Sequence, residues 1–475
     1  MLATDPCFLP LSKLALLLKS RDLSVLEITQ CYLNRIEKKS HLNAFITVCK
    51  NEAIEDAKRA DSEISSGQYK GLLHGIPLAV KDLIASKGIL TTSGSRILKN
   101  NIPDYDATVL AKLKEAGAIL LGKLQLCEFA GGDDINPLTG KGPVKNPWHE
   151  QVCAGGSSSG SAVAVAASLC AGSLGTDTGG SIRSPSAYTG IVGMKPTFGR
   201  VSRFGITPLS LSLDHVGPMS KTVEDNAILL ECIAGFDTKD RHSSSEPVSN
   251  FRKKLKIPVQ GLRIGLPKKF FFEYATQEVC DAVLQAAKEL ERQGSVLIDV
   301  ELPHLKYAFG VEFAILLSEA RAFHMQYLNQ DKENEYTPTF KYGVLEPAKT
   351  LTGVDYVQAK RIRNFIIRDF ENVYSKVDIL LTPGAEAAAP PLDEEGILKY
   401  TTQSGLRSPI EMWTRIYFPA NLSGVPSLVM PCGFSKTGLP LSLSLMGRHF
   451  DEATVYQVAH AYEKATHWHT FIPSV

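Results

Sequence analysis

A segment rich in serine and glycine, residues 154–181, carries the side chains of this sequence that are best suited to chemistry. Seven of its 28 residues are serine and seven are glycine. Glycine tolerates positive φ and close backbone approach, so the pairs at 155–156 and 179–180 can direct several N–H groups into one concavity that suits an anion. Ser157 directly follows the first pair and Ser181 the second. A hydroxyl beside backbone donors is the arrangement that acyl transfer needs, because the nucleophile then lies where negative charge develops on the carbonyl oxygen.

Two other interpretations of this segment are a flexible linker and a phosphate cradle. Linkers are polar throughout, whereas residues 162–169 form an uncharged run that must be buried. Neither GxGxxG nor GxxxxGK[ST] occurs around the serines. Acyl transfer is therefore the favoured chemistry.

The serines need a base, and no histidine lies near either glycine pair in the sequence. Lys81 is another candidate because it ends the apolar run 74–80, where a buried strand would leave the sheet. A lysine with a pKa of about 10.4 would not serve as a base at neutral pH, but desolvation can lower that pKa by several units. Taken alone, Lys81 is more simply a solvated loop residue; its combination with the two serines indicates catalysis.

Together Lys81, Gly155-Gly-Ser-Ser and Gly175-Thr-Asp-Thr-Gly-Gly-Ser-Ile-Arg resemble the amidase signature family of serine hydrolases. The resemblance runs through Met219 and reappears in Pro419-Ala-Asn-Leu-Ser-Gly-Val-Pro, so it covers essentially the whole chain. It implies an α/β fold: a single large domain with a twisted mixed β-sheet flanked by helices on both sides.

The resemblance also assigns roles. It implies that Ser181 is the nucleophile, that Ser157 relays the proton from a non-proline cis peptide, and that Lys81 is the base. The implied oxyanion donors are the backbone N–H groups of Thr178, Gly179, Gly180 and Ser181.

Neighbouring residues are expected to shape the loops. Asp177 and Arg183 match the family motif and predict a buried ion pair, and Ser158 is expected to be structural as well. Ser159 departs from the family, in which glycine commonly follows the two serines. Asp82 is expected to be a helix cap or a structural partner.

The surrounding sequence predicts the elements that position these residues. Short apolar runs bounded by glycine or proline indicate strands, and longer runs with helical periodicity indicate helices. The predicted strands cover residues 76–80, 118–121, 191–194, 262–267, 377–383, 427–431 and 441–446. The predicted helices lie within 11–65 and cover 108–116, 277–293 and 453–466. This alternation also favours an α/β fold.

We expect one domain over residues 1–475, built from three parts. Residues 1–65 are predicted to form a helical N-terminal wrap. Residues 66–235 and 417–475 form the signature core, and residues 236–416 form a variable substrate-side region.

The composition limits the partners. With 51 Lys+Arg and 50 Asp+Glu the formal net charge is +1, which favours neither a nucleic-acid binder nor a basic membrane anchor. Nine cysteines without a CxxC pair indicate free thiols, with Cys153 and Cys170 as small apolar fillers. No apolar run reaches membrane-spanning length. We expect a cytoplasmic monomer or homodimer that uses no metal and no cofactor.

The substrate depends on the middle of the chain, roughly residues 305–416. One family branch, the glutaminase (A) subunit of tRNA-dependent amidotransferases, holds glutamine with an arginine from this region and an aspartate shortly before Pro-x-Asn-Leu. Here that stretch contains Arg415 and no acid, whereas Trp413, Tyr417 and Phe418 suggest an apolar pocket or ordinary core packing.

Three functions therefore remain open. The first is a stand-alone hydrolase of a small or aryl/alkyl amide, whose chemistry would also serve a carbamate (a urethanase) or an ester. The second is an amidotransferase subunit that works with partner subunits. The third is a non-catalytic binding protein on the same scaffold, which the intact Lys81, Ser157 and Ser181 disfavour.

Overall fold

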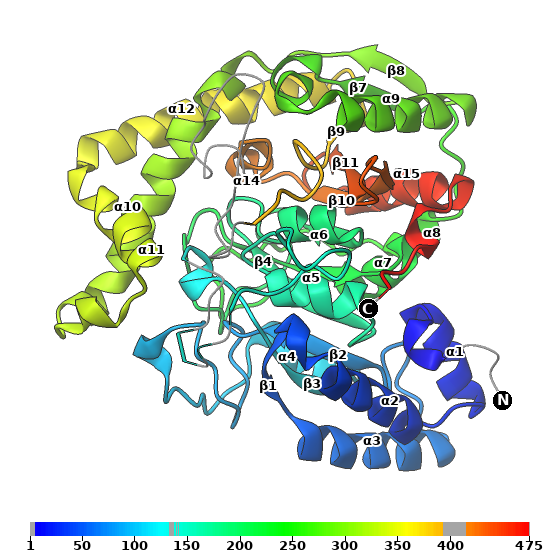
Figure 1. Ribbon diagram of the computed structural model, residues 1–475. Helices are drawn as coiled ribbons and strands as arrows, with labels where there is room; N and C mark the ends of the chain where they lie inside the picture. Colours follow the sequence, from blue (N-terminus) through cyan, green and yellow to red (C-terminus); the bar gives the residue numbers. More distant parts are fainter. Residues whose placement is uncertain (1–4, 133–136, 139, 141, 393–414, 475) are drawn as a thin grey trace.

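A single 11-stranded mixed sheet organises the molecule (Figure 1). The computed structural model describes residues 5–132, 137–138, 140, 142–392 and 415–474. Across the sheet the strands follow the order β1-β3-β2-β4-β6-β5-β10-β11-β9-β7-β8. Helices pack on both faces, so the predicted α/β fold is confirmed.

The sheet contains both parallel and antiparallel pairs. The strands are β1 (Phe45–Val48), β2 (Pro77–Lys81), β3 (Ile119–Leu124), β4 (Gly172–Asp177), β5 (Val192–Lys195), β6 (His215–Ser220), β7 (Arg263–Leu266), β8 (Val296–Asp299), β9 (Ile379–Pro383), β10 (Ser427–Phe434) and β11 (Pro440–Gly447). Strand β2 pairs in parallel with both β3 and β4, while β4 pairs antiparallel with β6. All seven predicted strands are present.

Four strands escaped prediction: β1, β4, β6 and β8. β4 and β6 are buried but rich in glycine, serine and proline, which have low intrinsic strand preference. β1 and β8 have four residues each and lie at the two ends of the sheet, where half-exposed side chains give a weak pattern.

The N-terminal segment contains three helices, α1 (Leu11–Ser20), α2 (Val25–Lys38) and α3 (Lys50–Ser65) (Figure 1, blue). α2 packs on β2 and β3, α3 packs on β3 and α2, and α1 packs on the later helix α7 (Val223–Ile233). Ser24 and Glu27 form a reciprocal capping box that starts α2. Strand β1 lies between α2 and α3 in the sequence and joins the sheet, so this segment is not wholly helical.

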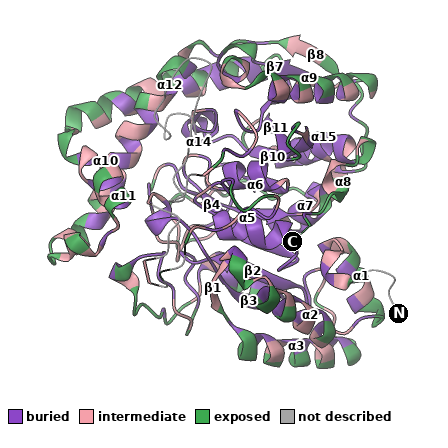
Figure 2. Ribbon diagram, in the orientation of Figure 1, coloured by how far each residue is buried: buried purple, intermediate pink, exposed green. Residues whose placement is uncertain are grey.

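Helices α5 (Ser159–Ala166) and α6 (Arg183–Thr189) are buried along their whole lengths (Figure 2). Small side chains let α5 approach the backbone of its neighbours. A Cβ at Gly160 would lie 2.5 Å from the carbonyl oxygen of Ala44. The uncharged run in the sequence is therefore a central helix, which excludes the linker interpretation.

A further group of helices covers the later strands of the sheet. α7 (Val223–Ile233), α9 (Gln277–Arg292) and α15 (Glu452–Ala465) pack on strands, whereas α4 (Thr108–Glu115) packs on α7, and α8 (Phe251–Lys254) packs on α7 and α15. In α9 the buried Val279, Val283 and Leu290 recur at helical spacing. The other face of α9 is largely exposed.

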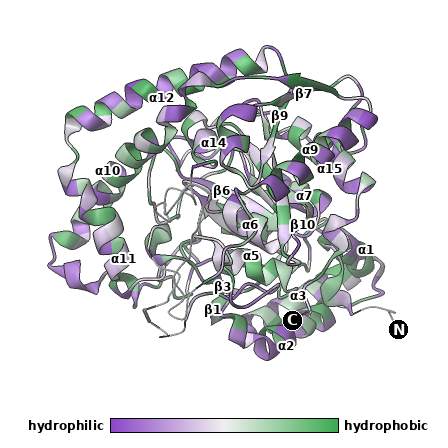
Figure 3. Cartoon of the chain, turned by 45° about the horizontal axis from the view of Figure 1, so that its top comes forward, coloured by the Kyte–Doolittle hydropathy of each residue, from purple (hydrophilic) through white to green (hydrophobic). Residues whose placement is uncertain are grey.

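The middle region forms an arm of helices beside the sheet (Figure 1, yellow and yellow-green). Its elements are α10 (Ala308–Leu328), α11 (Pro338–Phe340) and α12 (Gly353–Tyr374), and α14 (Phe418–Ser423) packs against α10 and α12. Hydrophilic and hydrophobic residues alternate along α10 and α12 (Figure 3).

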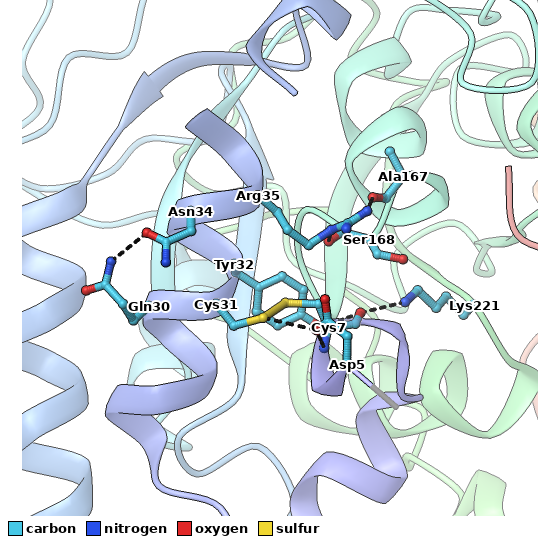
Figure 4. Close-up of a disulfide and its surroundings, with 10 residues drawn as sticks. All are labelled: Asp5, Cys7, Gln30, Cys31, Tyr32, Asn34, Arg35, Ala167, Ser168 and Lys221. Carbon is cyan, nitrogen blue, oxygen red and sulfur yellow. Dashed lines mark hydrogen bonds between the residues drawn. A yellow bond between two sulfur atoms is a disulfide. The ribbon is translucent and has the colours of Figure 1, made fainter. Parts of the chain in front are cut away.

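One expectation about the cysteines is wrong. Cys7 and Cys31 form a disulfide that ties the N-terminal turn to α2, with Cα atoms 6.5 Å apart (Figure 4). The partners stand 24 residues apart without a recognisable motif, so no sequence pattern indicates the pairing. Among the described residues the other seven cysteines take part in no disulfide. Cys153 and Cys170 are buried, as expected for apolar fillers.

Two findings bear on metals and membranes. Within the described ranges, the only group of three potential metal ligands is Asp5, Cys7 and Cys31, and its two thiols are joined in the disulfide. No described helix combines the length and apolar composition that crossing a bilayer requires.

Candidate active site

Lys81 is the last residue of β2 and is fully buried. Its Nζ atom lies 2.8 Å from Ser157 Oγ, 2.9 Å from Ser158 Oγ and 2.9 Å from Thr176 Oγ1. Because β2 runs parallel to β4, Lys81 and Thr176 emerge toward the same end of neighbouring strands. The structure thus places the predicted base against the predicted relay serine.

The segment that carries Ser157 turns sharply before α5. Gly155 has φ +77°, and a Cβ there would come within 2.5 Å of Pro185 Cα. The peptide bond between Gly156 and Ser157 is cis, as the resemblance implies. The N–H of Ser158 donates to the carbonyl oxygen of Ser181 over 3.1 Å. The two serine segments therefore lie side by side, with Ser157 buried and Ser181 half-buried.

A buried ion pair holds the loop between β4 and α6. Arg183 donates from Nε and Nη2 to the two carboxylate oxygens of Asp177 at 3.0 and 2.9 Å. Asn421 Nδ2 donates to Asp177 Oδ1 at 2.9 Å. Burial opposes ionisation of Asp177, but the guanidinium of Arg183 overcomes it and holds the pKa of that carboxyl well below its ordinary value. The predicted loop-shaping pair is present.

The glycine pair after Thr178 presents backbone donors. Gly180 has φ +117°, and its N–H donates to Asp177 Oδ1 at 2.9 Å. Within the part of the chain that the structure describes, the N–H groups of Gly179 and Ser181 make no hydrogen bond. Among the donors expected for an oxyanion, Gly180 is thus already engaged, whereas Gly179 and Ser181 are available.

Two aromatic rings confine this loop. A Cβ at Gly179 would meet Phe418 Cε1 at 2.7 Å, and one at Gly180 would meet the Tyr417 ring at 2.6 Å. Both aromatic residues are buried. Any larger residue in place of either glycine would therefore displace a ring of the substrate-side packing.

Thr178 links the loop to a buried acid. Its hydroxyl donates to Asp214 Oδ1 at 2.6 Å, and the N–H groups of Leu209 and Ser210 also donate to that carboxylate. Burial raises the pKa of Asp214 to about 6, against the opposing effect of these hydrogen bonds.

Two further residues considered in the sequence, Asp82 and Arg415, make contacts with other side chains. Asp82 is not a helix cap: it lies 3.4 Å from Lys123 Nζ and accepts from the hydroxyl of Thr92 at 2.6 Å. Arg415 stacks on the ring of Tyr274, with 3.7 Å from Cζ to the ring centroid. Trp413 lies outside the described residues.

Sequence reasoning did not single out three polar neighbours of the site: Thr176, Asp214 and Asn421. Thr176 and Asn421 both stand inside quoted motifs, so their positions could have marked them. Asp214 carries no local signal, because only the pairing of β4 with β6 brings it beside Thr178.

Comparisons with known proteins agree with this geometry. The family model described as amidase matches residues 27–456. The chain therefore belongs to the amidase signature family, and it is an amidohydrolase that acts on C–N amide bonds.

The similar proteins include an amidotransferase subunit and two kinds of amidase. The chain is 38% identical to the A-type subunit of the glutamyl-tRNA(Gln) amidotransferase from Desulfatibacillum aliphaticivorans, over 96% of this chain and 97% of that protein. It is similar to the peptide amidase of Stenotrophomonas maltophilia, with 32% identity, a TM-score of 0.83 and coverage of 96% of each chain. It is also similar to a bacterial aryl acylamidase, with 26% identity, a TM-score of 0.88 and coverage of 98% and 97%.

Proposed function

We propose that this protein hydrolyses its amide substrate through an acyl-enzyme on Ser181, with Ser157 and Lys81 as the proton relay. The observation that carries the proposal is the 2.8 Å contact between Lys81 Nζ and Ser157 Oγ in a fully buried position. Burial disfavours the charged form of a lysine, which suits a base.

The steps follow from this arrangement. Neutral Lys81 takes a proton from Ser157, which takes one from Ser181 as the Ser181 oxygen bonds to the amide carbon. The N–H groups of Gly179 and Ser181 then stabilise the oxyanion, and each donor of this kind contributes about 3 kcal/mol. The protons return along the relay to the leaving nitrogen as the C–N bond breaks. Water hydrolyses the resulting ester and frees the serine.

Glutamine is the substrate that similarity favours over the apolar amide expected from the sequence. The curated relatives are named as A-type subunits of an amidotransferase for glutamyl-tRNA(Gln), and the similarity spans nearly the whole of both chains. In this role the chain would work with partner subunits that use the released ammonia.

A small aryl or alkyl amide is the second candidate. Tyr417 and Phe418 pack directly on the glycine pair of the proposed nucleophile's loop, so apolar surface borders the reaction centre. Structural similarity to an aryl acylamidase also supports an aryl amide as the substrate. A carbamate or an ester would use the same acyl-enzyme chemistry.

The test is amine or ammonia release from glutamine, an anilide, an aliphatic amide and a carbamate, with wild type beside Ser181→Ala. Turnover that is lost in the variant supports the proposal. A fluorophosphonate label on a peptide other than that of Ser181 would contradict it. Glutamine turnover with co-purifying subunits would favour the amidotransferase role, and anilide turnover by the single chain would favour the second candidate.

A further inference from the structure

One buried carboxylate beside the site has no hydrogen-bond partner among the described residues. Glu312 stands in the second turn of α10 and is fully buried. Neither of its carboxylate oxygens makes a hydrogen bond anywhere in the described ranges. Buried polar groups are nearly always hydrogen-bonded in native proteins, so an exception in this position calls for a functional explanation.

Glu312 lies against the loop of the proposed nucleophile. Its Oε1 atom is 3.7 Å from the point where a Cβ on Gly179 would stand. Gly179 is two residues before Ser181 and is a proposed oxyanion donor. The carboxylate therefore lies against one of the proposed oxyanion donors.

Three cations act on Glu312 (Arg363, Arg183 and Lys195), but none forms an ion pair with it among the described residues. Glu312 and Glu319 lie two turns apart on α10, and Arg363 is the cation that acts on both. The described residues include no ion pair between Arg363 and Glu312; Arg363 donates instead to the carbonyl oxygens of Leu422 and Ser212. Arg183 is engaged by Asp177, and Lys195 Nζ donates to the carbonyl oxygens of Pro196 and Val425. Glu312 therefore has cations around it but no direct charge partner among the described residues.

Glu319 shows what a satisfied carboxylate looks like on the same helix. It accepts from the hydroxyls of Ser210, Ser212 and Tyr356 at 2.6 to 2.8 Å, and from the N–H of Ser212. Although burial opposes ionisation, these bonds lower its pKa, whereas burial raises the pKa of Glu312 well above the ordinary value. Of these two carboxylates, only Glu312 is left without a hydrogen-bond partner among the described residues and is therefore able to bind a ligand.

The surroundings of Glu312 favour a cation. Phe309 and Phe313 flank it on α10 and their rings pack with that of Phe418. In such an apolar setting an ammonium–carboxylate contact is stronger than in water, and aromatic faces also attract cations. A neutral substrate would leave the carboxylate without a partner, which penalises its binding.

We propose that Glu312 is a specificity-determining residue that binds a protonated amine of the amide substrate. The inference rests on the proposed hydrolysis at Ser181 and narrows its substrate class to amides with an ammonium group near the scissile carbonyl. Glutamine belongs to this class, and so does a simple aminoalkyl amide.

The experiment compares amides that differ only in the ammonium group. One pair is 4-aminobutanamide and pentanamide, and the other is glutamine and glutaramate. Wild type should prefer the amine-bearing member of at least one pair by about tenfold or more in kcat/KM, equal to about 1.4 kcal/mol. In Glu312→Gln this preference should fall at least about tenfold, while kcat/KM for the neutral member should not fall, because the substitution removes the penalty of an unpartnered carboxylate.

The matched control is Glu371→Gln, which removes an exposed carboxylate from α12. It should leave the preference unchanged. Equal kcat/KM values of wild type for both members of each pair would overturn the inference. An equal fall in kcat/KM for both members in Glu312→Gln would overturn it too, because that result indicates a purely structural residue.

Binding separates this inference from the proposed function. If wild type hydrolyses none of the four amides, the proposed function fails for this substrate class, and thermal unfolding of Ser181→Ala with each amide decides the inference. A larger rise in melting temperature with the amine-bearing member, lost when Glu312→Gln is added, would support it. Equal shifts would refute it.

Discussion

Two regions that meet at the glycine pair 179–180 satisfy their buried polar groups differently. On the signature-core side, Lys81 lies against three hydroxyls and Asp177 is held by Arg183 and Asn421. On the substrate side, the buried Glu312 has no hydrogen-bond partner among the described residues. Lys81 and Asp177 thus have partners before any substrate binds, whereas Glu312 has none among the described residues. If Ser181 and Glu312 act as proposed, the chemistry depends on the core and the selectivity depends on the helical arm.

The strongest test of the core side is loss of the nucleophile or the base. Ser181→Ala and Lys81→Ala should each lower kcat by about 10³-fold or more, and the double variant should be little worse, because residues of one relay act as a unit. Steady-state kinetics on any turned-over amide would measure this. Additive losses would mean that the two residues act independently. Unchanged melting temperatures would show that the loss is chemical.

The second test removes one member of the buried ion pair. Arg183→Ala leaves Asp177 as an uncompensated buried charge, which should cost about 3–5 kcal/mol of unfolding free energy. Denaturant unfolding would measure this. The matched control is Arg292→Ala on α9, which breaks an exposed pair with Glu289 and should cost far less, because exposed ion pairs contribute little to stability. Equal losses of unfolding free energy in the two variants would show that the buried pair contributes no more than an exposed one.

The third test acts far from both regions. Cys7→Ser removes a disulfide that closes a 24-residue separation, which should lower stability by about 3 kcal/mol on the chain-entropy account. Dithiothreitol should destabilise wild type to a similar degree and leave Cys7→Ser unaffected. Because the bond ties only the N-terminal turn to α2, substrate preference should not change. A changed preference would show that selectivity is not confined to the helical arm.

The smallest expected effect is a pH dependence at the junction of the two regions. Asp214 binds Thr178 of the core loop and the N–H of Ser210, whose hydroxyl donates to Glu319 of the arm. Its pKa is raised by burial from 3.8 to about 6, so the folded state binds its proton more tightly than the unfolded state. Stability from this group is therefore present below pH 3.8 and is lost as pH rises to about 6, by about 2–3 kcal/mol. Asp214→Asn should reduce this pH dependence of the unfolding free energy, measured by denaturant unfolding at several pH values. An unchanged pH dependence would mean that another group causes it.

Sequence and structure agree best where local pattern and burial coincide. Lys81 follows an apolar strand, and Ser157 and Ser181 follow glycine pairs, so motif and chemistry identified them together. Cys7 and Cys31 could not be paired from the sequence, because only the packing of the N-terminal turn on α2 brings them together.

Glu312 escaped prediction for a related reason. An acid in an apolar stretch of helix has no local signature of function, and the importance of Glu312 follows from its lack of hydrogen-bond partners among the described residues. Likewise Asp214 depends on strand pairing and not on any motif of its own. Long-range contacts therefore account for what the sequence left open.

The hydrogen bond from Asn421 to Asp177 joins residues 244 positions apart. During synthesis the loop that carries Ser181 leaves the ribosome long before the residue that braces it. A nascent or truncated chain that ends before α14 therefore lacks both Asn421 and the carbonyl of Tyr417 that Arg183 engages. Such a chain contains Lys81, Ser157 and Ser181 but lacks the brace on the loop of Ser181. Under the proposed mechanism, hydrolytic competence therefore arises only when the protein is almost fully made.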